Sequence, residues 1–149
     1  MNNPIKNQVQ ILQKMGIDQL NPMQIEAIDA IDKSKEVLIL SPTGTGKTLA
    51  FLLPLIERLD PTLAETQLLI LVPARELAIQ IEQVVRDMGT GYKVNAVYGG
   101  RSGSKEKIEL THAPTILVGT PGRVADHIRR DRITPVSYTH LRAHETRGN

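Results

Sequence analysis

Ser41–Thr48 reads SPTGTGKT and lies between an apolar run, Val37–Leu40, and a stretch of helical spacing that follows it. Between a strand and a helix, a glycine-rich loop can aim successive backbone N–H groups, and the positive end of the helix dipole, at one point. Gly44 and Gly46 carry no Cβ, so the chain can adopt positive φ at both positions. The loop therefore suits the phosphates of a nucleoside triphosphate.

Two side chains at the end of the loop complete this expected phosphate site. Lys47 can bridge the outer phosphates as a point charge, and the Thr48 hydroxyl can ligate Mg²⁺. Ser41 stands where the general pattern GxxxxGKS/T has its first glycine, so the match is to a variant of that pattern. The alternative is a glycine-rich corner without a ligand, which would need neither the lysine nor the threonine.

Outward from the loop, apolar runs of strand length alternate with stretches of helical period. The expected strands are Val37–Leu40, Leu68–Val72, Val94–Tyr98 and Ile116–Val118. The expected helices are Val9–Met15, Met23–Ile31, Thr48–Leu59, Glu76–Met88, Lys105–Leu110 and Pro121–Arg130. This alternation predicts an α/β fold with a mostly parallel sheet and helices on both faces. In such a sheet, ligands gather at the carboxyl ends of the strands.

The amino-acid composition of the chain limits which kinds of ligand and partner it is expected to bind. The 149 residues suit a single domain, and the net charge of +2 is too small to indicate a nucleic-acid partner. With one phenylalanine, three tyrosines and no tryptophan, stacking of bases on aromatic side chains is not expected. The absence of cysteine excludes disulfides and thiolate metal sites. A polar N-terminus and no apolar run of membrane length predict a soluble cytoplasmic protein without a membrane partner.

Further short motifs fall at the expected strand ends and helix starts. Ahead of the loop stand Gly16 and then Asn21–Gln24 (NPMQ), and after the second strand comes Pro73–Ala78 (PARELA). The third strand is followed by Gly99 and Gly100, and the fourth by TPGR at Thr120–Arg123.

Each of these motifs alone has a plain structural reading. Gln24 could be a solvated residue in a first helical turn, and Glu76 could simply complement a helix dipole. The glycine pair could form a turn without a ligand. The Thr120 hydroxyl can cap a helix or bind phosphate, and Arg123 can pair with phosphate or with a neighbouring acid. His112 and His127 are expected to be solvated or to cap helices rather than to bind a metal.

In this order, the motifs resemble the first RecA-like domain of DEAD-box RNA helicases, over about residues 5–130. The resemblance implies a RecA-like P-loop NTPase fold that uses ATP and Mg²⁺ and contacts the sugar-phosphate backbone of RNA. It assigns the adenine to Gln24 and the catalytic roles to Lys47 and Thr48, with Mg²⁺ on Thr48. The residues expected to bind ATP are Gln24, Ser41, Thr43, Gly44, Thr45, Gly46, Lys47 and Thr48. The residues expected to contact RNA are Pro73, Arg75, Gly99, Gly100, Thr120, Pro121, Gly122 and Arg123.

The sequence departs from the family pattern in several places. Ala74 replaces the usual threonine, and no aromatic residue precedes Phe51 to stack on the adenine. Ile5 is a candidate to cover the base instead. The Asp-Glu-Ala-Asp box, which in the family holds Mg²⁺ and orients the attacking water, does not occur in the sequence.

The last residues have no place in the family pattern. Residues 135–149 read PVSYTHLRAHETRGN, which resembles a translated reading frame of a transposase-based sequencing adapter. We therefore expect residues 1–134 to form a partial first RecA-like domain, incomplete at its C-terminus, and residues 135–149 to be an artefactual, disordered tail.

The sequence thus predicts a fragment of an ATP-dependent RNA helicase that is inactive without the box and the second RecA-like domain. Two other readings stay open. One is a DNA-directed helicase of the same superfamily, and the other is a non-catalytic ATP-binding interaction module.

Overall fold

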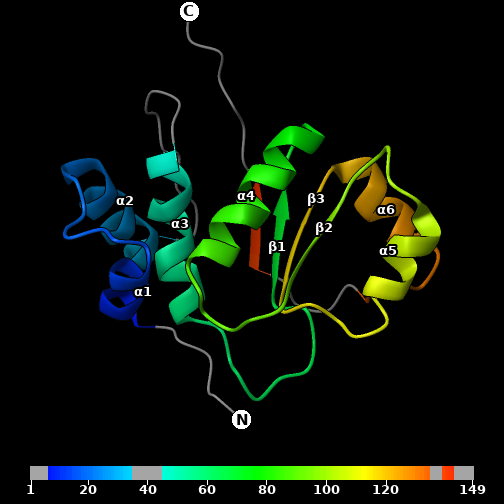
Figure 1. Ribbon diagram of the computed structural model, residues 1–149, viewed down its shortest axis with the longest axis horizontal. Coiled ribbons are helices and arrows are strands. Elements are labelled where there is room, and N and C mark those ends of the chain that lie inside the picture. Colours follow the sequence, from blue (N-terminus) through cyan, green and yellow to red (C-terminus); the bar gives the residue numbers. More distant parts are fainter. Residues whose placement is uncertain (1–6, 35–44, 135–138, 143–149) are drawn as a thin grey trace, which may run out of the picture.

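The computed structural model describes residues 7–34, 45–134 and 139–142 (Figure 1). The expected strand Val37–Leu40, most of the glycine-rich loop and Ile5 lie outside the described residues. Within the described part of the chain, no helix is long and apolar enough to cross a membrane.

Within the described residues, four parallel strands form one sheet. They are β1 (Leu68–Leu71), β2 (Val94–Val97), β3 (Ile116–Gly119) and β4 (Thr139–Arg142), in the spatial order β2-β3-β1-β4. Ile116 of β3 is in register with Leu68 of β1 on one side and with Val94 of β2 on the other. Because neighbouring strands run the same way, their carboxyl ends lie along one edge of the sheet.

Six helices surround the described part of the sheet. They are α1 (Gln8–Lys14), α2 (Pro22–Lys33), α3 (Thr45–Glu57), α4 (Arg75–Asp87), α5 (Gly103–Glu109) and α6 (Pro121–Arg129). Every helix that the apolar spacing predicts is present, with ends that differ by a few residues at most.

The two faces of the sheet are covered by different helices. Ile70 and Val118 belong to a buried cluster with residues of α1, α3 and α4. Leu69, Leu117 and Val97 face the other way and pack with Leu110 at the end of α5, with residues of α6 and with Ile133 after α6. This alternation of neighbouring strand residues between two buried faces confirms the predicted α/β fold, with a parallel sheet and helices on both sides.

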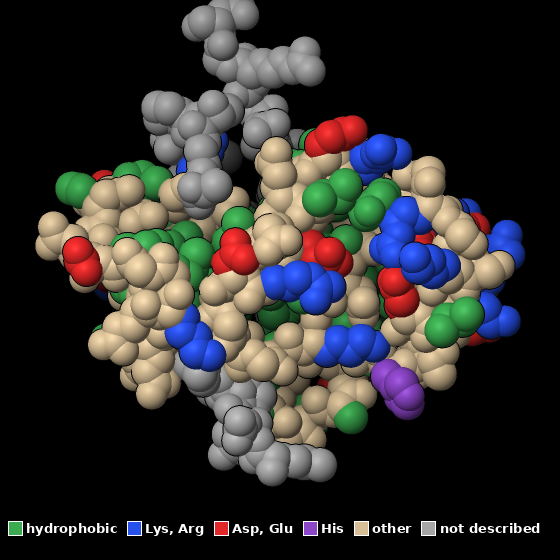
Figure 2. Space-filling view, in the orientation of Figure 1, with side chains coloured by type: hydrophobic (Ala, Val, Ile, Leu, Met, Phe, Trp, Pro, Cys, Tyr) green, Lys and Arg blue, Asp and Glu red, His purple; other side chains and the backbone are tan. Residues whose placement is uncertain are grey.

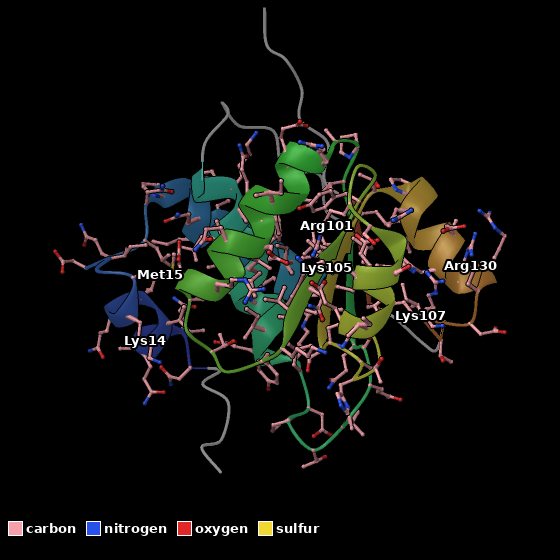
Figure 3. The ribbon with its side chains drawn as sticks, turned by 45° about the vertical axis from the view of Figure 1, so that its right-hand side comes forward. Lys14, Met15, Arg101, Lys105, Lys107 and Arg130 are labelled. Atoms are coloured by element: carbon pink, nitrogen blue, oxygen red, sulfur yellow. The ribbon has the colours of Figure 1, made fainter. Side chains whose placement is uncertain are left out.

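The N-terminal helices attach to this core through α3 and α4. α2 packs against α3, and Ile11 of α1 is fully buried in the larger cluster. The Lys14 ammonium donates a hydrogen bond to the Gly89 carbonyl at 2.8 Å, which joins the end of α1 to the turn after α4 (Figure 3). The helices α1 and α2 are therefore fixed relative to the sheet.

The C-terminal segment differs from expectation. Residues 139–142 form β4, which pairs in parallel with β1, whereas disorder was expected over residues 135–149. The physical reason is the edge of β1: the chain returns from α6 on the correct side to pair with it, and backbone pairing depends little on which side chains the strand carries.

Candidate functional site

Gln24 links α2 to the first turn of α3. Asn21 caps α2, and the two residues form a capping box in which each side chain accepts a hydrogen bond from the other's backbone N–H at 2.9 Å. The Gln24 amide nitrogen also donates to the Gly46 carbonyl at 3.3 Å, and the side chain is buried. A primary amide has two N–H groups and two lone pairs, so one of each stays available to a ligand.

The phosphate loop is described only from Thr45 onward. Ser41, Thr43 and Gly44 lie outside the described residues, while Lys47 and Thr48 are half-buried in the first turn of α3. The positive φ expected at Gly46 is wrong. Gly46 lies inside α3 and has helical backbone, because the helix begins at Thr45, earlier than the sequence pattern indicates.

The expected RNA-contacting motifs meet at the carboxyl edge of the sheet. Pro73 and Arg75 follow β1, the glycine pair follows β2, and Thr120–Arg123 follows β3. Backbone bonds hold these ends together: the Val72 N–H donates to the Gly119 carbonyl at 3.0 Å, and the Thr120 N–H donates to the Val97 carbonyl at 3.2 Å. We call this line of exposed and half-buried segments the motif rim.

Arg75 and Gly100 are neighbours on the motif rim. A Cβ built on Gly100 would lie 2.8 Å from Arg75 Nη1, and Gly100 has φ of +91°, which favours glycine. The Arg75 side chain is exposed, with Glu76 3.6 Å away. The structure therefore places an exposed cation beside a turn with exposed backbone.

The two side chains of the TPGR segment with alternative expected roles differ in outcome. Thr120 is the N-cap residue of α6 but its side chain makes no capping hydrogen bond, so the expected capping role is wrong. Arg123 pairs with an acid: its Nε donates to Glu106 at 2.7 Å and its Nη2 donates to the Arg101 carbonyl at 3.0 Å. A phosphate contact by Arg123 stays a prediction.

Asp126 lies one turn further along α6. The hydrogen bond from the Arg130 side chain holds the pKa of the Asp126 carboxyl below its ordinary value, and the charges of Arg130, Arg129 and Arg123 act in the same direction. Partial burial opposes them. Asp126 is thus a local partner for the arginines of α6.

Two buried polar residues were not anticipated as part of this region. Glu106 and His127 are both 0% exposed and lie 2.8 Å apart, although His127 was expected to be solvated or to cap a helix. Its position three residues after the buried Val124 places it on the apolar face of α6, which is the signal that could have found it. No sequence pattern marks Glu106, because its burial depends on how α5 docks against α6.

A hollow of about 510 Å³ opens at the opposite edge of the sheet, around residues that precede β1 and β3. Thr66, Ala113 and Pro114 are among the residues that line it, and none of the predicted site residues does.

A family model and the similar proteins both indicate the same family of helicases. A family model described as DEAD/DEAH box helicase matches residues 21–142. The ATP-dependent RNA helicase DeaD of Escherichia coli is 40% identical over 125 residues, which cover 82% of this chain and 20% of that protein. The probable ATP-dependent RNA helicase YfmL of Bacillus subtilis is 42% identical over 120 residues, which cover 79% of this chain and 32% of that protein.

A solved structure also resembles the chain. The crystal structure of a hypothetical ATP-dependent RNA helicase from Sulfolobus tokodaii superposes with a TM-score of 0.71 at 30% identity, over 85% of this chain and 38% of that one. The chain therefore spans about a fifth to about two fifths of the length of these similar proteins.

Proposed function

The chain belongs to the DEAD/DEAH box helicase family, and from this membership we propose that it forms most of the ATP- and RNA-binding part of the first RecA-like domain of an ATP-dependent RNA helicase. The observation that carries the proposal is the motif rim: segments far apart in sequence meet at one edge of a parallel sheet, next to the helix that follows the phosphate loop.

The proposed nucleotide site fits the chemistry of its residues. Gln24 retains an N–H donor and a lone pair that match the exocyclic amine of adenine and the ring nitrogen beside it. Backbone N–H groups of residues 44–48 and the Lys47 ammonium would hold the phosphates, and the Thr48 hydroxyl would ligate Mg²⁺. The ion would neutralise phosphate charge when bound.

The motif rim is proposed to hold an RNA backbone. Arg75 would supply a cation to the RNA phosphates. Gly99, Gly100 and the Thr120–Gly122 segment would offer backbone groups to a single RNA strand that lies along the rim. Charge favours this side of the molecule: residues 101–134 contain seven Lys and Arg against four Asp and Glu. Figure 2 shows more basic side chains over α5 and α6 than over α1 and α2. Such contacts carry no base sequence information.

Turnover of ATP is not expected from these 149 residues alone. They contain no Asp-Glu-Ala-Asp box, so no carboxylate of that kind is present to orient the attacking water. In the family pattern, unwinding also requires a second RecA-like domain that closes on ATP and RNA. ATP hydrolysis by this chain under saturating RNA, abolished in Lys47→Ala, would contradict the expected inactivity.

A pair of variants on one helix tests the RNA proposal. Arg75 and Arg86 both belong to α4 and have side chains that are about equally exposed, but only Arg75 lies on the motif rim. Binding of a fluorescently labelled ten-nucleotide oligouridine should weaken about three- to tenfold in Arg75→Gln and stay unchanged in Arg86→Gln, as expected for loss of one phosphate contact.

Equal weakening in both arginine variants would mean that binding is non-specific, and the RNA proposal would then be wrong. The same titration with oligodeoxythymidine addresses the DNA-directed alternative. RNA should bind more tightly, because 2′-hydroxyls distinguish the two backbones.

A further inference from the structure

We propose that Glu106 is a positioning residue, whose buried carboxylate holds the turn at Gly99–Gly100 and the loop at Thr120–Gly122 in one arrangement that fits an RNA backbone. This inference rests on the proposed RNA-binding function of the motif rim. It assigns Arg123 the role of a strut between the two segments, in place of the phosphate contact expected from the sequence.

The carboxylate receives three hydrogen bonds from different elements. Glu106 Oε1 accepts from Arg123 Nε at 2.7 Å and from His127 Nε2 at 2.8 Å, and Oε2 accepts from the Tyr98 backbone N–H at 3.1 Å. Because a carboxylate only accepts, the His127 tautomer must carry its proton on Nε2. One fully buried group thus ties the end of β2 to the first and the last turn of α6.

The same network holds the glycine turn from both sides. Before the glycines, the Tyr98 N–H donates to Glu106, and after them, the Arg101 carbonyl accepts from Arg123 Nη2 at 3.0 Å. Gly99 and Gly100 are therefore clamped between two contacts that belong to one carboxylate–guanidinium pair. Arg123 directly follows Gly122, so the clamp also fixes the end of the Thr120–Gly122 loop.

Arg101 and Arg132 complete the surroundings of the pair. Arg101 donates to the Ala96 carbonyl at 3.0 Å and to Glu109 at 2.8 Å, and it lies beside the sheet, whereas Arg130 lies on α6 toward the outside (Figure 3). Arg132 Nη1 lies 3.5 Å from His127 Nδ1. The cations around Glu106 outnumber the acids, and both oxygens of its buried carboxylate have hydrogen-bond partners.

The burial of the Glu106 carboxylate favours its pairing with Arg123 over other contacts of that arginine. A phosphate contact that drew Arg123 away from Glu106 would take a partner from a buried carboxylate, which is strongly disfavoured. The bidentate geometry of the guanidinium also matters: Nε and Nη2 reach two different acceptors at once, which a lysine ammonium at the end of a flexible chain would not reproduce.

Hydrogen exchange tests the positioning role without RNA. In Glu106→Gln, one oxygen becomes an NH₂ group, so either the Tyr98 N–H or the Arg123 and His127 donors lose their acceptor. In either case the clamp on the glycine turn weakens, so amide exchange should accelerate about tenfold or more at Tyr98 or at Gly100, as expected for losing a hydrogen bond to a charged group. Glu82→Gln on α4 removes the same charge from an ion pair outside this network and should leave these amides unchanged.

RNA binding tests the role of Arg123 through its salt dependence. In Arg123→Met, oligouridine affinity should fall about tenfold, while the slope of log Kd against log salt concentration stays as in the unaltered chain. Arg75→Met is the comparison, because loss of a true phosphate contact should lower that slope by about 0.7 for a single strand. Glu106→Gln and Arg123→Met should act as one unit, so the double variant should bind no more weakly than either single variant.

The possible outcomes separate this inference from the proposed function. If the unaltered chain binds no RNA, the proposed function is wrong, and the exchange experiment still decides whether Glu106 positions the turn. If RNA binds but Glu106→Gln leaves amide exchange and affinity unchanged, the positioning role is overturned. A lower salt slope in Arg123→Met would overturn the strut and restore Arg123 as a phosphate ligand. Arg123→Met serves as the second variant if Glu106→Gln does not fold.

Discussion

Gln24 shows how one side chain can join two helices. It completes the cap of α2 and holds the Gly46 carbonyl at the start of α3, which keeps the two helices in a fixed relation. The sequence predicts its place ahead of the phosphate loop, because it stands in a recognisable NPMQ motif. The contact with Gly46 could not be predicted, since it depends on how α2 packs on α3.

The carboxyl of Asp126 gives a prediction about pH. Its pKa is lowered in the folded state by the Arg130 hydrogen bond, so the unfolded chain binds this proton more readily. The stabilisation is therefore fully present above the ordinary value of about 3.9 and is lost as pH falls through the folded pKa. In urea unfolding, the stability gap between the unaltered chain and Asp126→Asn should narrow below about pH 4. A gap that stays constant from pH 6 to the acid limit would contradict this account.

At the level of elements, the contact between β3, β2 and α6 depends on the absence of a side chain at Gly119. A Cβ there would lie 2.6 Å from Val124 Cγ2 and 2.9 Å from the Val97 carbonyl oxygen, so neither α6 nor β2 could keep its present position. The close approach sets where the TPGR segment leaves the sheet.

Two glycine variants test that packing. Gly119→Ala should destabilise the fold by about 1 to 3 kcal/mol, because the added methyl overpacks a site bounded by backbone. Gly122→Ala is the matched control: nothing lies within 4 Å of its Cβ position, and alanine in a helical turn should stabilise by up to about 1 kcal/mol. Equal unfolding midpoints for the two variants in guanidinium would contradict the close packing at Gly119.

The strands and helices could be predicted from the sequence where the spacing of apolar residues is regular. The runs at β1 and β3 and the one-sided pattern of α4 place these elements within a residue or two. The burial of Glu106 was not predictable, because a charged residue on a short helix is expected to be solvated until its neighbours are known. Long-range docking, which no local pattern encodes, determines such sites.

For the whole molecule, the position of β4 is the main departure from expectation. β4 follows α6 in the chain and pairs with β1, so it stands where the family resemblance implies the strand that carries the acidic box. The family match likewise extends to residue 142. The artefactual origin of residues 135–149 stays a prediction, because backbone pairing does not depend on where a segment comes from.

Removing these residues tests what β4 contributes. A chain that ends at Thr134 should unfold at a lower temperature and aggregate more readily, because one edge of β1 loses its described partner strand. Calorimetry and light scattering at matched concentration would measure both effects. Indistinguishable melting and solubility would show that residues 135–149 add nothing to the sheet.

The central claim is that the loop before α3 holds a triphosphate through Lys47 and adjacent backbone amides. The most direct measurement is titration of the ¹⁵N-labelled chain with ATP and Mg²⁺, which follows the amides of Gly46, Thr48 and Gln24. We predict saturable shifts at these residues and an affinity about tenfold or more lower in Lys47→Ala, the loss expected for one charge-assisted contact. Equal affinity in the two chains, or shifts confined to other parts of the fold, would contradict the account.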